Sequence, residues 1–220
     1  MRVGFLTIGQ SPRHDILKEI LPLIPNVTPV EAGALDNISD KQIMLLKPEK
    51  KDETLVSRLR DGRQVILGKK KLIPLLNDAV VRLHSVGAKI AFLLCTSTFD
   101  FSSTPIPVIQ PGGIMRNLIG LLLSNEGKLG LVVPLEDQKQ QITEVWKRFV
   151  RDIKVITLSP YRGHELQPRE LEFLKDRDLI VMDCMGYRLE HERLIRRYTK
   201  RPVLLPKRLI PLLLKEFYQL

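Results

Sequence analysis

The only two cysteines of the chain stand where thiol chemistry is expected. Cys95 lies in the segment AFLLCTST (91–98), and Cys184 lies in LIVMDCMGY (179–187). Each follows a short apolar run and precedes small or turn-forming residues. A thiolate can accept a proton and a thiol can return one, and the free thiol pKa of about 8.5 falls beside a helix N-terminus or a cation. The two cysteines are therefore the first candidates for acid/base chemistry.

The apolar run before each cysteine predicts a strand that is buried on both faces, as in a parallel sheet. Cys95 and Cys184 then fall at the carboxyl ends of two strands. In open α/β sheets this edge binds ligands, because backbone amides and the starts of the following helices converge there. The spacing thus places both thiols at the edge where a ligand is expected.

The chain carries the marks of a duplication. An opening strand with its loop occurs twice, a cysteine-tipped strand follows each time, and a short strand with a proline and an apolar helix comes third. Three landmarks in one order predict two similar α/β lobes. The repeated segments are RVGFLTIGQSPR (2–13) with KLGLVVPLEDQ (128–138), and IPVIQPGGIMRNLIGLLL (106–123) with RPVLLPKRLIPLLLKEF (201–217).

The order of apolar patterns predicts alternating strands and helices. We expect a first lobe over residues 1–110, joined by the C-terminal helix 206–220, and a second lobe over residues 111–205. Strands are expected at 3–8, 27–31, 89–94, 129–134, 153–158 and 179–183, and helices at 70–86, 136–150, 168–176 and 188–199.

Two further local predictions concern the first lobe. Ser11-Pro12 favours a helix start there, with serine as the cap and proline in the first turn. Residues 43–68 predict a hairpin-like insertion around the charged turn 48–52, and the Asp61-Gly62 pair indicates a second hairpin turn.

Length and composition bound the class of protein. The 220 residues are 44% hydrophobic, which is enough for real cores, and no apolar stretch approaches the roughly 20 residues of a membrane span. The strand expected from Val3 leaves no room for an export signal, so we expect a cytoplasmic protein. Two cysteines in such a chain are expected to be thiols rather than a disulfide framework.

The net charge of +10 raises the question of nucleic acid. The basic residues are spread over several elements and interleaved with acids, and only 5% of the residues are aromatic. This pattern argues against a nucleic-acid partner and favours a solvated basic surface. The positive charge could also steer small anions toward a site. The histidines lack metal-ligand spacing, so no metal site is expected. The glycines of residues 111–113 lack the spacing of a phosphate loop or a dinucleotide-binding motif.

Three segments carry a resemblance to a known family. TIGQSPR (7–13), EAGALD (31–36) and DCMGY (183–187) together resemble the AroM family, and the match runs the length of the chain. More remotely, two lobes with one cysteine each resemble the aspartate/glutamate racemase superfamily. The superfamily resemblance implies two similar flavodoxin-like α/β lobes with mostly parallel sheets, a pseudo-twofold duplication, a cleft between the lobes, and catalysis without cofactor or metal.

This resemblance gives the cysteines a specific task. Inverting a carbon next to a carboxylate requires a base on one face and an acid on the other, and a thiolate/thiol pair can exchange these roles. We expect Cys95 and Cys184 to be this pair in a racemase-like isomerase or lyase that acts on a small carboxylate-bearing molecule. The residues expected to bind this substrate are Gly9, Gln10, Ser11, Thr96, Ser97, Thr98, Gly186 and Tyr187.

Alternatives remain open at this stage. Asp183 would tend to raise the thiol pKa of Cys184, and Cys95 could be only a small buried residue. The alternative function is a non-catalytic ligand-binding or regulatory protein on the same scaffold, with a link to aromatic amino-acid metabolism. Arg13 and His14 could reach an anionic substrate or lie on the surface. The sequence leaves the oligomeric state open, a homodimer included.

Overall fold

The chain divides into two compact units, each built on its own sheet. A computed structural model describes residues 1–123, 126–161 and 168–218. Unit 1 comprises residues 1–111 and 210–220, and unit 2 comprises residues 112–209.

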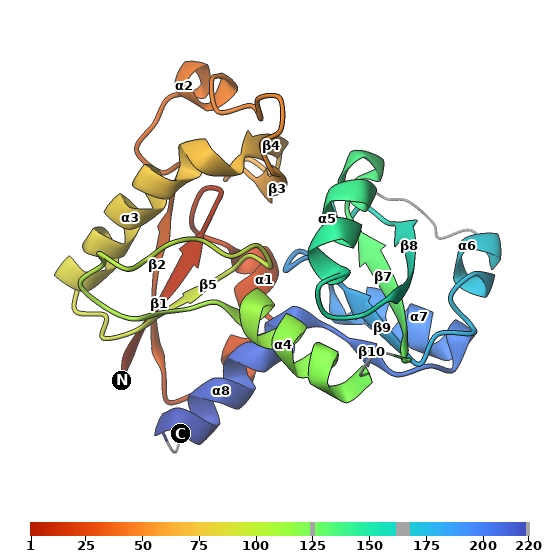
Figure 1. The fold of residues 1–220 in the computed structure, drawn as a ribbon. Helices are drawn as coiled ribbons and strands as arrows, with labels where there is room; N and C mark the ends of the chain where they lie inside the picture. Colours follow the sequence, from red (N-terminus) through yellow and green to blue (C-terminus); the bar gives the residue numbers. More distant parts are fainter. Residues whose placement is uncertain (124–125, 162–167, 219–220) are drawn as a thin grey trace. The chain divides into compact units, whose positions relative to one another are not determined.

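Unit 1 is built on a parallel sheet of four strands in the order β2-β1-β5-β6. Strands β1, β2 and β5 are labelled in Figure 1. The apolar runs expected of buried strands form it, and Val3, Phe5 and Leu6 of the central β1 are fully buried. The strands are β1 (Arg2–Thr7), β2 (Thr28–Gly33), β5 (Ala91–Leu93) and β6 (Val108–Ile109).

The long helix α3 (Lys69–Ser85) covers β1 and β2 of this sheet. Its buried residues recur at helical spacing, which is why the sequence predicted it within a residue at each end. They are Leu72, Leu76, Ala79, Val80 and Leu83. The unit also contains α1 (His14–Leu17), the short 3-10 helix η1 (Leu21–Leu23) and the C-terminal α8 (Leu209–Tyr218).

The expected cap of the first helix was wrong. Helix α1 begins at His14 after Arg13, and no side chain caps it. The Ser11 hydroxyl instead donates to Asp36 at 2.8 Å. Ser11 therefore binds a partner distant in the sequence, and its hydroxyl does not cap the helix.

The insertion in unit 1 contains one hairpin, not two. Strands β3 (Thr54–Arg58) and β4 (Gln64–Gly68) pair antiparallel, and the turn between them contains Gly62 at φ +93°. Glycine tolerates this left-handed conformation at little cost, so the Asp61-Gly62 signal was correct. In place of the expected strand before residues 48–52, the chain forms helix α2 (Asp40–Met44). This helix begins with a capping box between Ser39 and Gln42.

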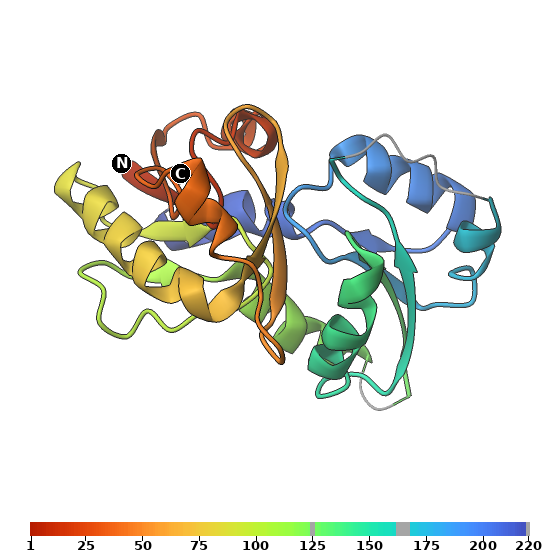
Figure 2. The ribbon, with the colours of Figure 1, turned by 90° about the horizontal axis from the view of Figure 1, so that it is seen from above.

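Unit 2 has a parallel sheet of four strands in the order β10-β9-β7-β8. Figure 2 shows α5 and α7 on opposite faces of this sheet. The strands are β7 (Lys128–Val133), β8 (Asp152–Thr157), β9 (Leu179–Met182) and β10 (Val203–Leu204). The helices are α4 (Pro111–Leu123), which begins at the unit boundary, η2 (Glu136–Gln138), α5 (Lys139–Trp146), α6 (Pro168–Glu172), α7 (Leu189–Thr199) and η3 (Pro206–Arg208).

The two sheets have the same topology. In chain order, β1, β2, β5 and β6 of unit 1 take the places that β7, β8, β9 and β10 take in unit 2. In each unit the first strand is central and its partner from the first crossover lies at the edge. An α/β fold with parallel sheets and internal duplication is therefore confirmed.

Candidate active site

Cys95 and Cys184 occupy equivalent positions in the two units. Each follows its strand, β5 or β9, with a single residue between. Cys95 is half-buried and Cys184 is 9% exposed. The two cysteines are not joined by a disulfide bond.

The hydrogen-bond register makes this equivalence exact to the residue. Leu94, just before Cys95, donates its N–H to the carbonyl oxygen of Leu6 at 2.7 Å. Asp183, just before Cys184, makes the same bond at 2.9 Å to the carbonyl oxygen of Val132. Leu6 lies opposite the last residue of β5, and Val132 lies opposite the last residue of β9. The two halves of the chain thus present a thiol at the same point.

The surroundings of Cys184 combine a donor and a carboxylate. The Gly186 N–H donates to the Cys184 Sγ at 3.4 Å, and a donor to sulfur favours the thiolate. The neighbouring Asp183 is 5% exposed, and its Oδ2 accepts from the Trp146 Nε1 at 2.7 Å. Trp146 is fully buried at the end of α5. The hydrogen bond from Trp146 therefore fixes the carboxylate of Asp183. The equivalent residue of unit 1, Leu94, has no charge.

Tyr187 is a buried anchor of this loop. It is fully buried, and its hydroxyl donates to the Leu158 carbonyl oxygen at 2.7 Å. Burial raises the pKa of Tyr187 well above its usual value, and the charges of Cys184 and Asp183 act in the same direction. A neutral phenol is thus held beside the cysteine loop.

Gly186 lies against the ring of Tyr161. A Cβ at residue 186 would stand 2.5 Å from the Tyr161 hydroxyl oxygen and 2.7 Å from the ring carbon that bears it. Only a residue without a side chain allows this approach. Tyr161 was not singled out from the sequence, because nothing in its local pattern signals this contact.

The loop after β1 brings Gly9, Gln10 and Ser11 together, and its polar groups have partners within unit 1. The Ser11 N–H and hydroxyl donate to the two carboxylate oxygens of Asp36 at 2.7 and 2.8 Å. The Gln10 side chain donates to the Leu35 carbonyl oxygen at 3.3 Å and accepts from the Arg60 N–H at 2.9 Å. The Gly9 carbonyl oxygen accepts from the Leu35 N–H at 3.1 Å.

Arg13 is buried at the end of this loop rather than on the surface. It is 3% exposed, and its guanidinium binds both carboxylate oxygens of Asp15 at 2.9 Å. It also donates to the hydroxyls of Thr7 at 3.2 Å and Ser57 at 3.5 Å. Burial raises the pKa of Glu31, while the hydrogen bond from the Arg13 N–H opposes this shift. This network joins the loop to β3 of the insertion.

The loop after β5 meets a charged pair that the sequence did not indicate. The Ser97 hydroxyl donates to the Glu53 Oε1 at 2.5 Å, and the Glu53 Oε2 accepts from the Lys69 Nζ at 2.7 Å. Ser97 is 9% exposed, while Thr96 and Thr98 beside it are half-buried. Glu53 stands just before β3 and Lys69 is the first residue of α3. Glu53 and Lys69 both lie in charged runs, which from the sequence alone indicate a solvent-exposed turn and a solvent-exposed helix start.

The profile of the family described as AroM protein matches residues 3–218. The chain belongs to the AroM family. No curated protein shows significant sequence similarity to it.

Solved structures share the fold of this AroM family member at low sequence identity. Arylmalonate decarboxylase has a TM-score of 0.61 at 14% identity, with 97% of this chain and 92% of that chain covered. Allantoin racemase from Klebsiella pneumoniae has a TM-score of 0.64 at 11% identity, covering 100% and 88%. Glutamate racemase from Aquifex pyrophilus has a TM-score of 0.57 at 17% identity, covering 99% and 84%. The racemase-like fold expected from the sequence is thereby confirmed.

Among residues 1–123, 126–161 and 168–218, no group of three or more His, Cys, Asp or Glu side chains could hold a metal ion. In the same part of the chain, no helix is long and apolar enough to cross a membrane.

Proposed function

We propose that this AroM family member is a cofactor-independent isomerase or lyase of the racemase type. Its substrate is a small carboxylate-bearing molecule, and Cys95 and Cys184 are the acid/base pair. The observation that carries the proposal is the equivalent position of the two thiols at the carboxyl ends of β5 and β9. Two racemases and a decarboxylase, by their names, are among the solved proteins with this fold, which supports the same reaction class.

The proposed chemistry is a two-base proton transfer. One cysteine thiolate removes the proton from the carbon next to the carboxylate, and the electron pair of that C–H bond moves into the carboxylate. The other cysteine donates its S–H proton to the opposite face of the carbon. The configuration is inverted, and the two sulfurs have exchanged protonation states. In a substrate with two carboxyl groups on that carbon, one can leave as carbon dioxide while the electron pair of the broken C–C bond moves into the other. A cysteine thiol then protonates the carbon, and the reaction is a decarboxylation.

The surroundings of Cys184 suit an alternation between thiolate and thiol. The Gly186 N–H, which donates to the Sγ, favours the thiolate, whereas the charge of Asp183 favours the thiol. These opposed influences support a sulfur that can change protonation state. The loops at residues 9–11 and 96–98, with Gly186, are the proposed substrate-binding segments, and the buried Tyr187 anchors the loop that holds Cys184 and Gly186.

A non-catalytic ligand-binding protein is the second candidate. The observation that favours it is the binding of both Ser11 donors to Asp36, which leaves this loop fewer donors for a substrate carboxylate.

Hydrogen exchange at the substrate carbon separates the two candidates. The wild-type protein is incubated in D₂O with single enantiomers of amino acids, and proton NMR and chiral chromatography follow the α-carbon. We expect one of these substrates to racemise with deuterium incorporation, and we expect Cys95→Ser and Cys184→Ser each to abolish racemisation, because inversion needs both thiols. Racemisation that persists in either variant would refute the two-thiol mechanism.

A further inference from the structure

We propose that Glu53, with Ser97 and Lys69, selects substrates that carry an ammonium group beside the carboxylate. This inference rests on the proposed function, because it names the substrate class of the same site. Glu53 would be the residue that discriminates such zwitterions from plain carboxylates and dicarboxylates.

Glu53 reaches the carboxyl edge of the unit 1 sheet through the insertion that holds β3 and β4. Ser97 stands two residues beyond Cys95, and its hydroxyl donates to Glu53. In unit 2 the corresponding connection, between β8 and β9, contains α6 alone among its described residues. The insertion therefore adds a carboxylate to one of two otherwise similar loops.

The hydrogen bond to Glu53 changes what Ser97 can offer a ligand. A serine hydroxyl has one hydrogen, and here Glu53 takes it. Ser97 is then left with acceptor lone pairs only. Each Glu53 carboxylate oxygen also keeps a lone pair beyond the bonds from Ser97 and Lys69. These oxygens would receive a donor such as an ammonium group and repel a carboxylate.

Lys69 supplies the complementary charge. Its Nζ lies 2.7 Å from the Glu53 Oε2, and the side chains of Glu53 and Lys69 are 24% and 25% exposed. The ammonium and carboxylate groups of an α-amino acid are separated by a similar distance, roughly 2.5–3 Å. A zwitterion can therefore lie antiparallel to this pair, with its ammonium on Glu53 and its carboxylate on Lys69.

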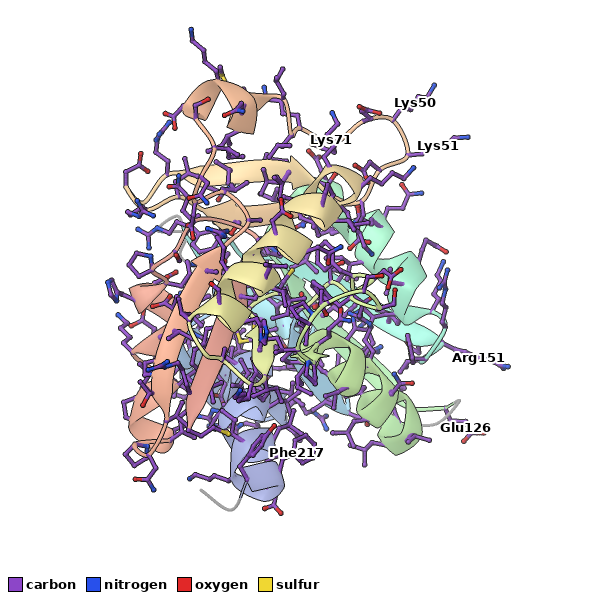
Figure 3. The ribbon with its side chains drawn as sticks, turned by 90° about the vertical axis from the view of Figure 1, so that its left-hand side faces the viewer. Lys50, Lys51, Lys71, Glu126, Arg151 and Phe217 are labelled. Atoms are coloured by element: carbon purple, nitrogen blue, oxygen red, sulfur yellow. The ribbon has the colours of Figure 1, made fainter. Side chains whose placement is uncertain are left out.

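The surrounding surface explains why a selective carboxylate is needed. Lys50 and Lys51 extend outward from the loop before β3, and Lys71 lies near them at the start of α3 (Figure 3). Such lysines attract any small carboxylate. Glu53 belongs to the same insertion and is held in place by Lys69 and Ser97. It can therefore discriminate among the anions that these surface lysines attract.

Calorimetric titration with matched ligand pairs tests this inference. The full-length protein is titrated with phenylalanine against 3-phenylpropanoate and with glutamate against glutarate, so that each pair differs only in the ammonium group. We expect an amino acid to bind wild type at least about 10-fold more tightly than its partner. In Glu53→Gln this preference should fall to within about 2-fold, mainly through weaker amino-acid binding, because the amide oxygen lacks the negative charge.

One further variant controls for structural damage, and a second removes the hydrogen bond to Glu53. Glu49→Gln removes a carboxylate of the same insertion that is 73% exposed and paired with Lys71, and it should keep the preference of wild type. Ser97→Ala should reduce the preference in the same direction as Glu53→Gln. The inference is overturned if no amino acid of the panel binds, if the deamino partner binds as tightly, or if Glu53→Gln weakens both partners equally.

These outcomes are distinct from failure of the proposed function. If Glu53-dependent amino-acid binding holds while the cysteines are unreactive, the protein is a binding module and the selection by Glu53 survives. If the cysteines are reactive but plain carboxylates protect them regardless of Glu53, the isomerase proposal survives and the zwitterion inference fails.

Discussion

At the scale of single residues, the environment of Cys184 depends on contacts between its neighbours in the loop and two large aromatic side chains. Gly186 places its N–H on the Cys184 sulfur while its Cα lies against Tyr161. Asp183 is fixed by Trp146, a contact between residues 37 positions apart. The thiol environment is therefore set by partners from elsewhere in unit 2.

Gly186→Ala tests this packing. The added methyl would stand 2.5 Å from the Tyr161 hydroxyl oxygen, so we expect a loss of about 1–3 kcal/mol in the free energy of unfolding. Urea denaturation measures the change. In a Tyr161→Ala background the methyl has room, and the same substitution should cost less than about 1 kcal/mol. An equal cost in both backgrounds would show that Tyr161 is not the obstacle.

At the scale of elements, the sequence predicted what local patterns determine. The six expected strands and α3 follow from apolar periodicity, and all are present. Ser11 as a helix cap failed because Asp36, 25 residues away, binds its hydroxyl. Glu53 and Lys69 were missed because a charged residue in a polar run looks solvated until a distant loop, here the one with Ser97, is brought to it.

The C-terminal helix α8 offers a prediction at this scale. Leu214 is fully buried, whereas Leu212 on the same helix is 55% exposed. Leu214→Ala should reduce the free energy of unfolding by about 2–5 kcal/mol, because it leaves a cavity. Leu212→Ala should change it by no more than about 0.5 kcal/mol. Thermal and urea denaturation of the two variants provide the comparison, and similar costs would contradict the burial pattern of α8.

At the scale of the whole molecule, the duplication is the central fact. Sequence landmarks predicted two similar lobes, and the sheets of the two units match strand for strand. The match extends to the residue just before each cysteine, which donates its N–H to the equivalent position of the neighbouring strand in both units. Two differences, Asp183 in place of Leu94 and the insertion with Glu53, distinguish the two halves chemically.

The pH dependence of cysteine alkylation tests the central claim most directly. The folded protein is treated with iodoacetamide across a pH series, both alone and in the presence of a panel of amino acids and dicarboxylic acids. Mass spectrometry follows the alkylation of Cys95 and Cys184 separately. The account predicts that both thiols react with apparent pKa values below about 8.5 and that one ligand protects both. Thiols that are inert, or that titrate at the ordinary value without ligand protection, would contradict it.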